Sequence, residues 1–114
     1  ALGNVLDGGA GVDTLKGAAG DDVYVVDNTG DVVMEALNAG NDTVFSSVTF
    51  ALKNNVENLL LLGNQTINGT GNNLANVMTG NAASNTLNGG AGADSLAGGG
   101  SWETIRIQST IAAI

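Results

Sequence analysis

Residues 8–25 read GGAGVDTLKGAAGDDVYV, which divides into the nonapeptides GGAGVDTLK (8–16) and GAAGDDVYV (17–25). Both units carry Gly at positions one and four, Asp at position six and a large apolar residue at position eight. Gly permits the positive φ of a tight turn, and the apolar residue suits a short strand that faces a core. Because one unit is too short to bury a core alone, the repeat predicts a solenoid.

The nonapeptide frame extends over most of the chain, with Asp, Asn or Glu at position six and an apolar residue two places later. In the N-terminal part the pairs are Asn4/Leu6, Asp13/Leu15, Asp22/Tyr24, Asp31/Val33 and, after a step of eleven residues, Asp42/Val44. In the C-terminal part they are Asn76/Met78, Asn85/Leu87, Asp94/Leu96 and Glu103/Ile105. Between Val48 and Thr66 the pattern is too irregular to place turns.

The composition excludes several kinds of function. The 114 residues include 18 Gly and 15 Asn but no Cys, His or Pro, and 11 acids outnumber 3 Lys and Arg, for a net charge of -8. Without Cys or His there is no disulfide, thiolate nucleophile or imidazole base. Such an acidic chain is a poor partner for nucleic acid or an anionic membrane, and no apolar run approaches the ~20 residues of a membrane span. An affinity for cations remains.

The repeat resembles the nonapeptide GGxGxDxUx, with U large and apolar, of the RTX (repeat-in-toxin) calcium-binding β-roll family. GGAGVDTLK (8–16) and GGAGADSLA (89–97) match every specified position, and GAAGDDVYV (17–25) misses one Gly. Degenerate copies are GNNLANVMT (71–79), GNAASNTLN (80–88) and GGGSWETIR (98–106). The resemblance implies an all-β fold, a right-handed parallel β-roll or β-helix solenoid with calcium bound in its turns.

Stacking of the turns predicts where the ions bind. If two repeats complete one coil, turns n and n+2 stack ~4.8 Å apart and bring their position-six carboxylates together. Two such charges at ~4 Å repel by roughly 4 kcal/mol at an effective dielectric of ~20, which a Ca²⁺ with oxygen ligands reverses. One edge should carry Asp13 and Asp31, and the other Asn4, Asp22 and Asp42.

The family resemblance adds carbonyl oxygens of the turns as ligands. The predicted calcium ligands are Asp13, Asp22, Asp31, Asp42, Asp94, Gly9, Gly11, Ala18, Gly20, Gly90 and Gly92. Seven of the eight Asp lie within residues 1–42, so most calcium should bind there. In the second block Asp94, with Gly90 or Gly92, is the best candidate among zero to two sites.

Other polar and aromatic residues have plainer interpretations. Asn76 and Asn85 are neutral and weaker calcium ligands, and we expect them to form a hydrogen-bonded ladder between coils. We interpret Asp7, Asp27 and Glu57 as turn formers or surface charges; for Asp27, which precedes a turn, recruitment to that turn is the alternative. Tyr24 takes an inward slot and is expected to be a core residue. Trp102 (98–106) is either exposed or folded over the end of the roll.

We expect one continuous domain with four parts. Residues 1–47 form the calcium-rich repeats, 48–68 irregular intervening coils, 69–106 an Asn-rich second block, and 107–114 a cap or a tail that belongs to an export signal. Because the sequence starts inside a repeat, we also expect further residues upstream.

The resemblance implies a secreted, extracellular, non-catalytic module. It would fold on exposure to extracellular calcium and stabilise, or assist type I secretion of, a larger protein with an upstream catalytic or toxin domain, and we expect a monomer. The alternative is a polysaccharide-binding or adhesin module attached to a carbohydrate-active enzyme. Catalysis by a carboxylate pair is disfavoured, because calcium binding explains the acids better.

Overall fold

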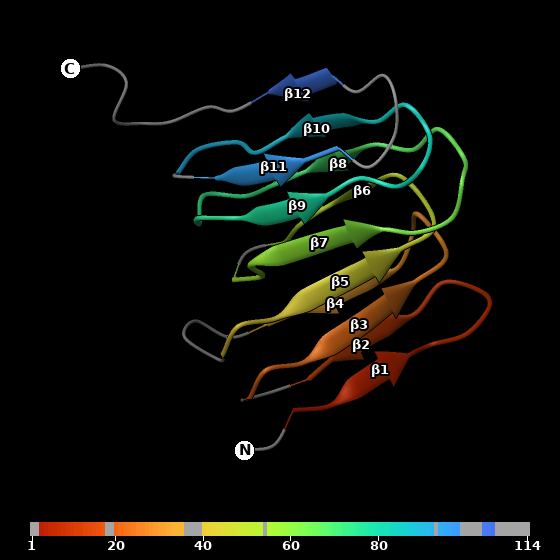
Figure 1. Ribbon diagram of the computed structural model, residues 1–114. Helices are drawn as coiled ribbons and strands as arrows, with labels where there is room; N and C mark the ends of the chain where they lie inside the picture. The colour runs from red at the N-terminus through yellow and green to blue at the C-terminus, as the bar shows by residue number, and fades with distance from the viewer. Residues whose placement is uncertain are drawn as a thin grey trace.

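The computed structural model describes residues 3–17, 20–35, 40–53, 55–92, 94–98 and 104–106. Within these residues the chain forms short β-strands and no helix (Figure 1). The described part of the chain therefore has no helix with the length and apolarity needed to cross a membrane. The strands are β1 (Val5–Asp7), β2 (Thr14–Lys16), β3 (Val23–Val26), β4 (Val32–Met34), β5 (Thr43–Ser46), β6 (Phe50–Ala51), β7 (Asn58–Leu61), β8 (Gly69–Thr70), β9 (Val77–Thr79), β10 (Thr86–Asn88), β11 (Ser95–Ala97) and β12 (Thr104–Arg106).

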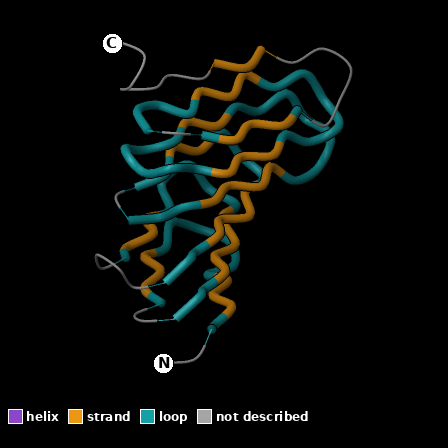
Figure 2. The backbone as a smooth tube through the Cα atoms, turned by 60° about the vertical axis from the view of Figure 1, so that its left-hand side comes forward, coloured by secondary structure: helices purple, strands orange, loops and turns teal. Residues whose placement is uncertain are grey.

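Odd-numbered and even-numbered strands lie on opposite faces of a parallel β-roll. One face is a sheet in the order β1-β3-β5-β7-β9-β11, and the other contains the pair β2-β4 and the sheet β12-β10-β8-β6. Every described pairing is parallel, and Val5 pairs with Val23 eighteen residues later. Figure 2 shows the two layers of strands joined by turns. The predicted all-β solenoid, with two nonapeptides in each coil, is confirmed.

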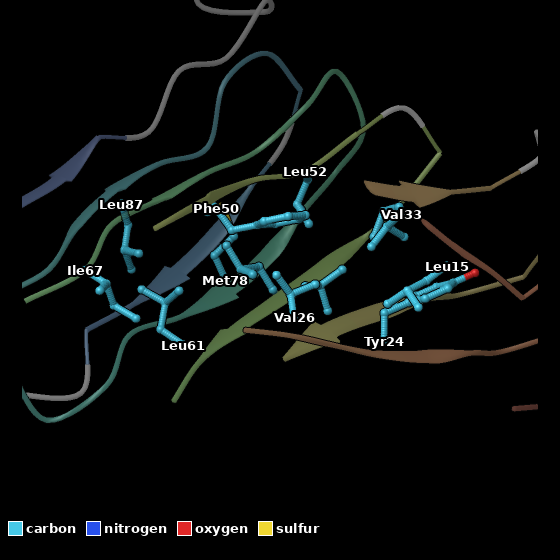
Figure 3. Close-up of a cluster of buried hydrophobic side chains, with 13 residues drawn as sticks. Leu15, Tyr24, Val26, Val33, Phe50, Leu52, Leu61, Ile67, Met78 and Leu87 are labelled. Atoms are coloured by element: carbon cyan, nitrogen blue, oxygen red, sulfur yellow. The ribbon is translucent and has the colours of Figure 1, made fainter. Parts of the chain in front are cut away.

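Apolar side chains from both faces fill the space between the layers (Figure 3). The position-eight residues Leu15, Tyr24, Val33, Val44, Met78 and Leu87 are all buried, and Leu6 and Leu96 pack partly against the same core. Their burial confirms that position eight points inward. Tyr24 is 0% exposed, so it is a core residue and offers no stacking platform to a sugar.

Residues 48–68 continue the same roll with coils of unequal length. From β3 to β5 the register advances 20 residues, since Val23 pairs with Thr43, and from β5 to β7 only 15, since Thr43 pairs with Asn58. Two neighbouring coils of different length cannot keep register on both faces. The face with β7 stays continuous, whereas β4 and β6 are not paired. A 460 Å³ cavity lies at this break, lined by residues of β4, Glu35, Leu52 and Lys53.

Candidate metal centre

The position-six residues stack along two edges of the roll, as the two-coil rule predicts. On one edge the backbone N–H of Asp13 donates to Asp31 Oδ1 over 2.8 Å. On the other, the N–H of Asn4 donates to Asp22 Oδ1 and that of Asp22 to Asp42 Oδ1, both over 2.8 Å. Each carboxylate is therefore held by the backbone of the preceding coil.

The second oxygen of most of these carboxylates has no hydrogen-bond partner. Asp22 and Asp42 are 1% and 0% exposed, yet Oδ2 of each is unpartnered within the described part of the chain. Oδ2 of Asp13 and of Asp94 is buried and unpartnered in the same way. An uncompensated buried carboxylate costs several kcal/mol, which a hard cation with oxygen ligands would offset. The residues present therefore fit Ca²⁺.

Glycine at position one leaves room for these oxygens. A Cβ atom at Gly8 would overlap Asp13 Oδ2, and one at Gly17 would overlap Asp22 Oδ2. The same holds at Gly89 in the second block. Position one is therefore Gly because the carboxylate of its own turn occupies the side-chain space.

The glycines predicted as carbonyl ligands lie in turns of repeated geometry. Their φ values are 73° at Gly9, 96° at Gly11, 72° at Gly90, 96° at Gly92 and 109° at Gly20. The matching φ values show that the GGAG segments of both blocks adopt the same turn conformation. Gly is needed at these positions because positive φ is accessible mainly to Gly. Ala18 lies outside the described residues. Calcium coordination by these carbonyl oxygens stays a prediction.

A first acidic cluster combines Asp13, Asp27 and Asp31, one carboxylate oxygen of each lying within 4.8 Å of the others. Asp27 was interpreted as a turn former or surface charge; it is exposed, and the turn brings it to the edge of the cluster. Asp31 has no unpartnered oxygen here, because its Oδ2 accepts the N–H groups of Asp27 and Asn28 at 3.2 Å. This site is the more open of the two clusters.

A second cluster combines Asp22, Glu35 and Asp42, again with one carboxylate oxygen of each within 4.8 Å of the others. Glu35 Oε1 is buried without a partner, and Oε2 accepts a hydrogen bond from the Tyr24 hydroxyl. Sequence reasoning missed Glu35. The sequence feature that could have revealed Glu35 is its position in the repeat: it directly follows β4, as Gly17 directly follows β2 one coil earlier.

Burial and mutual repulsion raise the pKa values of the acids on this edge. Burial, the contact with the Asp42 carboxyl group and the charges of Asp42 and Asp22 together raise the pKa of Glu35 to about 7, against the lowering effect of the Tyr24 hydrogen bond. Burial likewise raises the pKa of Asp42 and of Glu57. Raised carboxylate pKa values mean that the empty fold disfavours these negative charges, which a bound cation would stabilise.

Charge and desolvation act on the exposed acid of the first cluster as well. Partial desolvation, followed by the charges of Asp31, Asp7 and Asp13, raises the pKa of Asp27. Both edges of the N-terminal half therefore concentrate negative charge that the fold itself does not neutralise.

Asparagine replaces this arrangement with hydrogen bonds in the second block. Asn76 is 1% exposed, and its Nδ2 donates to the carbonyl oxygen of Glu57 over 3.0 Å and to Asn72 Oδ1 over 3.0 Å. Asn72 Nδ2 donates in turn to the carbonyl oxygens of Lys53 and Val56, over 2.6 and 2.7 Å. The amides thus connect to backbone carbonyls of the preceding coil.

The same pair of amides recurs one repeat later. Asn85 Nδ2 donates to the Ile67 carbonyl oxygen over 2.6 Å and to Asn81 Oδ1 over 3.0 Å. The predicted link between coils is confirmed, with one difference. In the pairs Asn72/Asn76 and Asn81/Asn85, the bond between the two side chains stays within one turn. The bonds from these side chains to the preceding coil end on backbone carbonyl oxygens.

Two acids complete the edge that carries Asp22 and Asp42. The sequence predicts a turn former or surface charge at Glu57, but its Oε1 accepts the N–H of Asp42 over 2.7 Å. Glu57 therefore makes the same hydrogen bond to the preceding coil as a position-six Asp. Asp94 Oδ1 accepts the N–H of Asn76 over 2.8 Å. Glu103 lies outside the described residues.

Stacked turns with unpartnered buried carboxylates, on a parallel two-faced roll, define a calcium-binding β-roll. The model of the RTX calcium-binding nonapeptide repeat matches this chain in four copies, over residues 2–33 and 70–101. The chain belongs to this family, whose repeat binds calcium. Searches of the curated proteins and of the solved structures gave no match.

Proposed function

We propose that this chain is a secreted module that folds when it meets extracellular calcium and so stabilises, or assists export of, a larger protein that carries it. The unpartnered Oδ2 atoms of Asp13, Asp22, Asp42 and Asp94 support the proposal. They are aligned by backbone hydrogen bonds and enclosed by the turns, so the fold depends on a cation to stabilise them.

The energetics favour an unfolded chain where calcium is scarce. Carboxylate oxygens within 4.8 Å of each other repel by roughly 3 kcal/mol for each pair at an effective dielectric near ~20. With 18 Gly the backbone also loses much conformational entropy on folding. Each bound ion stabilises the fold by about 2.7 kcal/mol when free calcium is about a hundred times its Kd. A few ions therefore decide the balance.

An unfolded state at low calcium suits export. An extended chain passes a narrow secretion channel, whereas a folded roll does not. Folding outside the cell, where calcium is abundant, would prevent return and provide a stable base for the attached domain. RTX repeats are typical of secreted proteins, which supports this order of events.

Calcium titration of the chelator-treated chain tests the proposal. Far-UV circular dichroism should show disorder in chelator and a cooperative gain of β-structure as calcium is added, with a matching fall in hydrodynamic radius. Magnesium at the same concentration is the control, since its small octahedral shell suits large multi-carboxylate cages poorly. A spectrum and radius that do not depend on calcium would contradict the proposal.

A further inference from the structure

Glu35 takes the first position of its repeat, where Gly8, Gly17 and Gly89 leave no room for a side chain. Lys16 of β2 pairs with Met34 of β4, so Glu35 directly follows its strand as Gly17 follows the strand one coil earlier. At Gly17 the space belongs to Asp22 Oδ2 and the Tyr24 hydroxyl. One coil later a glutamate takes this place and directs its carboxyl group to the same two residues.

Each carboxylate of the Asp22–Glu35–Asp42 cluster has one oxygen held by the protein and one without a partner. Asp22 Oδ1 accepts the N–H of Asn4, Asp42 Oδ1 accepts the N–H of Asp22, and Glu35 Oε2 accepts the Tyr24 hydroxyl. Oδ2 of Asp22, Oδ2 of Asp42 and Oε1 of Glu35 are buried and lack partners among the described residues. Three fixed carboxylates therefore offer three free oxygens.

Neighbouring groups hold Glu35 in this place. Gly17 N–H donates to the Tyr24 hydroxyl over 2.8 Å, which orients the hydroxyl proton toward Glu35. Asn55 Nδ2 donates to the backbone carbonyl oxygen of Glu35 over 3.1 Å from the following coil. Glu35 also lines the 460 Å³ cavity, together with residues of β4, Leu52 and Lys53.

We propose that Glu35 is a third carboxylate ligand of the calcium site formed with Asp22 and Asp42, that Tyr24 is its positioning residue, and that this site fills first. The inference rests on the proposed calcium-driven folding. Calcium affinity rises with the number of charged ligands and with their rigidity. The other cluster, Asp13 with Asp27 and Asp31, has an exposed member and a single buried oxygen without a partner, so it should fill later.

Terbium luminescence reads this site selectively, because Tyr24 is the only tyrosine of the chain. Tb³⁺ takes the oxygen ligands of Ca²⁺ and emits when a nearby tyrosine is excited. In a Trp102→Phe background, which removes the only tryptophan, emission should appear with the first ion bound and be displaced by calcium. Emission that appears only after the other sites have filled would overturn the inference.

The Glu35→Gln variant tests the ligand. Gln keeps the shape and the acceptor for Tyr24 but loses the charge, and we expect the first stepwise calcium affinity to fall roughly tenfold or more, with later steps little changed. The matched control is Asp7→Asn, which removes one charge from an exposed acid outside this cluster, whose Oδ1 accepts the N–H of Gly9. Tyr24→Phe should weaken the first step alone by several-fold, whereas a purely structural loss would shift all steps together.

The outcomes separate this inference from the proposed function. If the unaltered chain folds with calcium and Glu35→Gln binds its first ion as tightly, Glu35 is not a ligand and only this inference fails. If the unaltered chain binds no calcium, the proposed function itself fails. Should Glu35→Gln not fold at any calcium concentration, Glu35→Asp in the same assay decides, because restored folding with a weakened first step supports the inference and an unchanged first step overturns it.

Discussion

The N-terminal and C-terminal halves of the roll use one turn frame with opposite side-chain chemistry. Asp22 and Asn76 lie on the same edge, at the same repeat position and each 1% exposed. Asp22 binds an N–H of the preceding coil and leaves one oxygen free. Asn76 binds carbonyl oxygens of the preceding coil through its Nδ2. A single nitrogen in place of an oxygen thus replaces an unpartnered atom, which we propose binds calcium, with a donor to the backbone.

The difference means that the halves obtain their stability from different sources. In the first half, buried carboxylate oxygens have no hydrogen-bond partner, and under the proposed function folding there is conditional on an ion. In the second, the pairs Asn72/Asn76 and Asn81/Asn85 satisfy each other and the neighbouring coil without one. We therefore expect the second half to be the less calcium-dependent part.

Removing one charge from each edge of the first half should raise the calcium requirement most. Asp13→Asn with Asp22→Asn leaves the shape unchanged but removes two carboxylates whose Oδ2 atoms are buried and unpartnered, and the midpoint of the calcium-dependent folding transition should rise roughly tenfold or more. Circular dichroism across a calcium titration measures the midpoint.

Two comparisons make this prediction specific. Asp7→Asn with Asp21→Asn removes the same charge from exposed positions and should shift the midpoint little. Asn76→Ala with Asn85→Ala should shift it less than the Asp13 and Asp22 changes do. Equal shifts in the three double variants would end the division into a calcium half and an asparagine half.

Asn76→Ala should destabilise the calcium-loaded roll. The change removes the Nδ2 donor to the carbonyl oxygens of Val56 and Glu57 and leaves the backbone N–H of Asn72 without its Oδ1 acceptor, which costs about 1–3 kcal/mol. Urea unfolding in saturating calcium measures the loss. Asn73→Ala, at an exposed position of the same turn, is the control and should change stability by less than about 0.5 kcal/mol. Similar losses in both variants would show that the amide network is not what stabilises this half.

Asn76→Asp should move the boundary between the halves. The new carboxylate would stack on Asp94, whose Oδ1 already accepts the N–H of residue 76 and whose Oδ2 is unpartnered. We expect an additional calcium ion, counted by equilibrium dialysis, and lower stability in chelator because the amide bonds are lost. Asn73→Asp adds the same charge at an exposed position and should bind no additional ion; an unchanged count in Asn76→Asp would contradict the stacking rule.

Protons should partly replace calcium in the first half. Burial raises the pKa of Glu35 from 4.5 to about 7 in the folded chain, so the metal-free fold binds a proton more tightly than the unfolded chain does. Its contribution is fully present below pH 4.5 and is lost as pH rises through 7. In calcium-free buffer, circular dichroism should show more β-structure at pH 5 than at pH 8, and the gain should be smaller in Glu35→Gln. A gain as large in the variant would assign the effect to other acids.

Much of the site follows from spacing along the chain. The nine-residue period places Asp13 over Asp31, and Asp22 between Asn4 and Asp42, as the hydrogen bonds show. A period reports only positions that repeat. Glu35, Glu57 and Asp27 are not among the position-six acids that the period identifies, and their contacts depend on the local length of a coil.

The amino-acid order by itself determined the parallel roll, the inward position eight and the two edges, because Gly and apolar residues at a fixed period leave few other ways to bury a core. Only the tertiary structure decided that Glu35 joins Asp22 and Asp42, and that Glu57 continues their edge. The physical reason is that coils of 20 and 15 residues shift the stacking. Which acid meets which turn then depends on packing and not on periodicity.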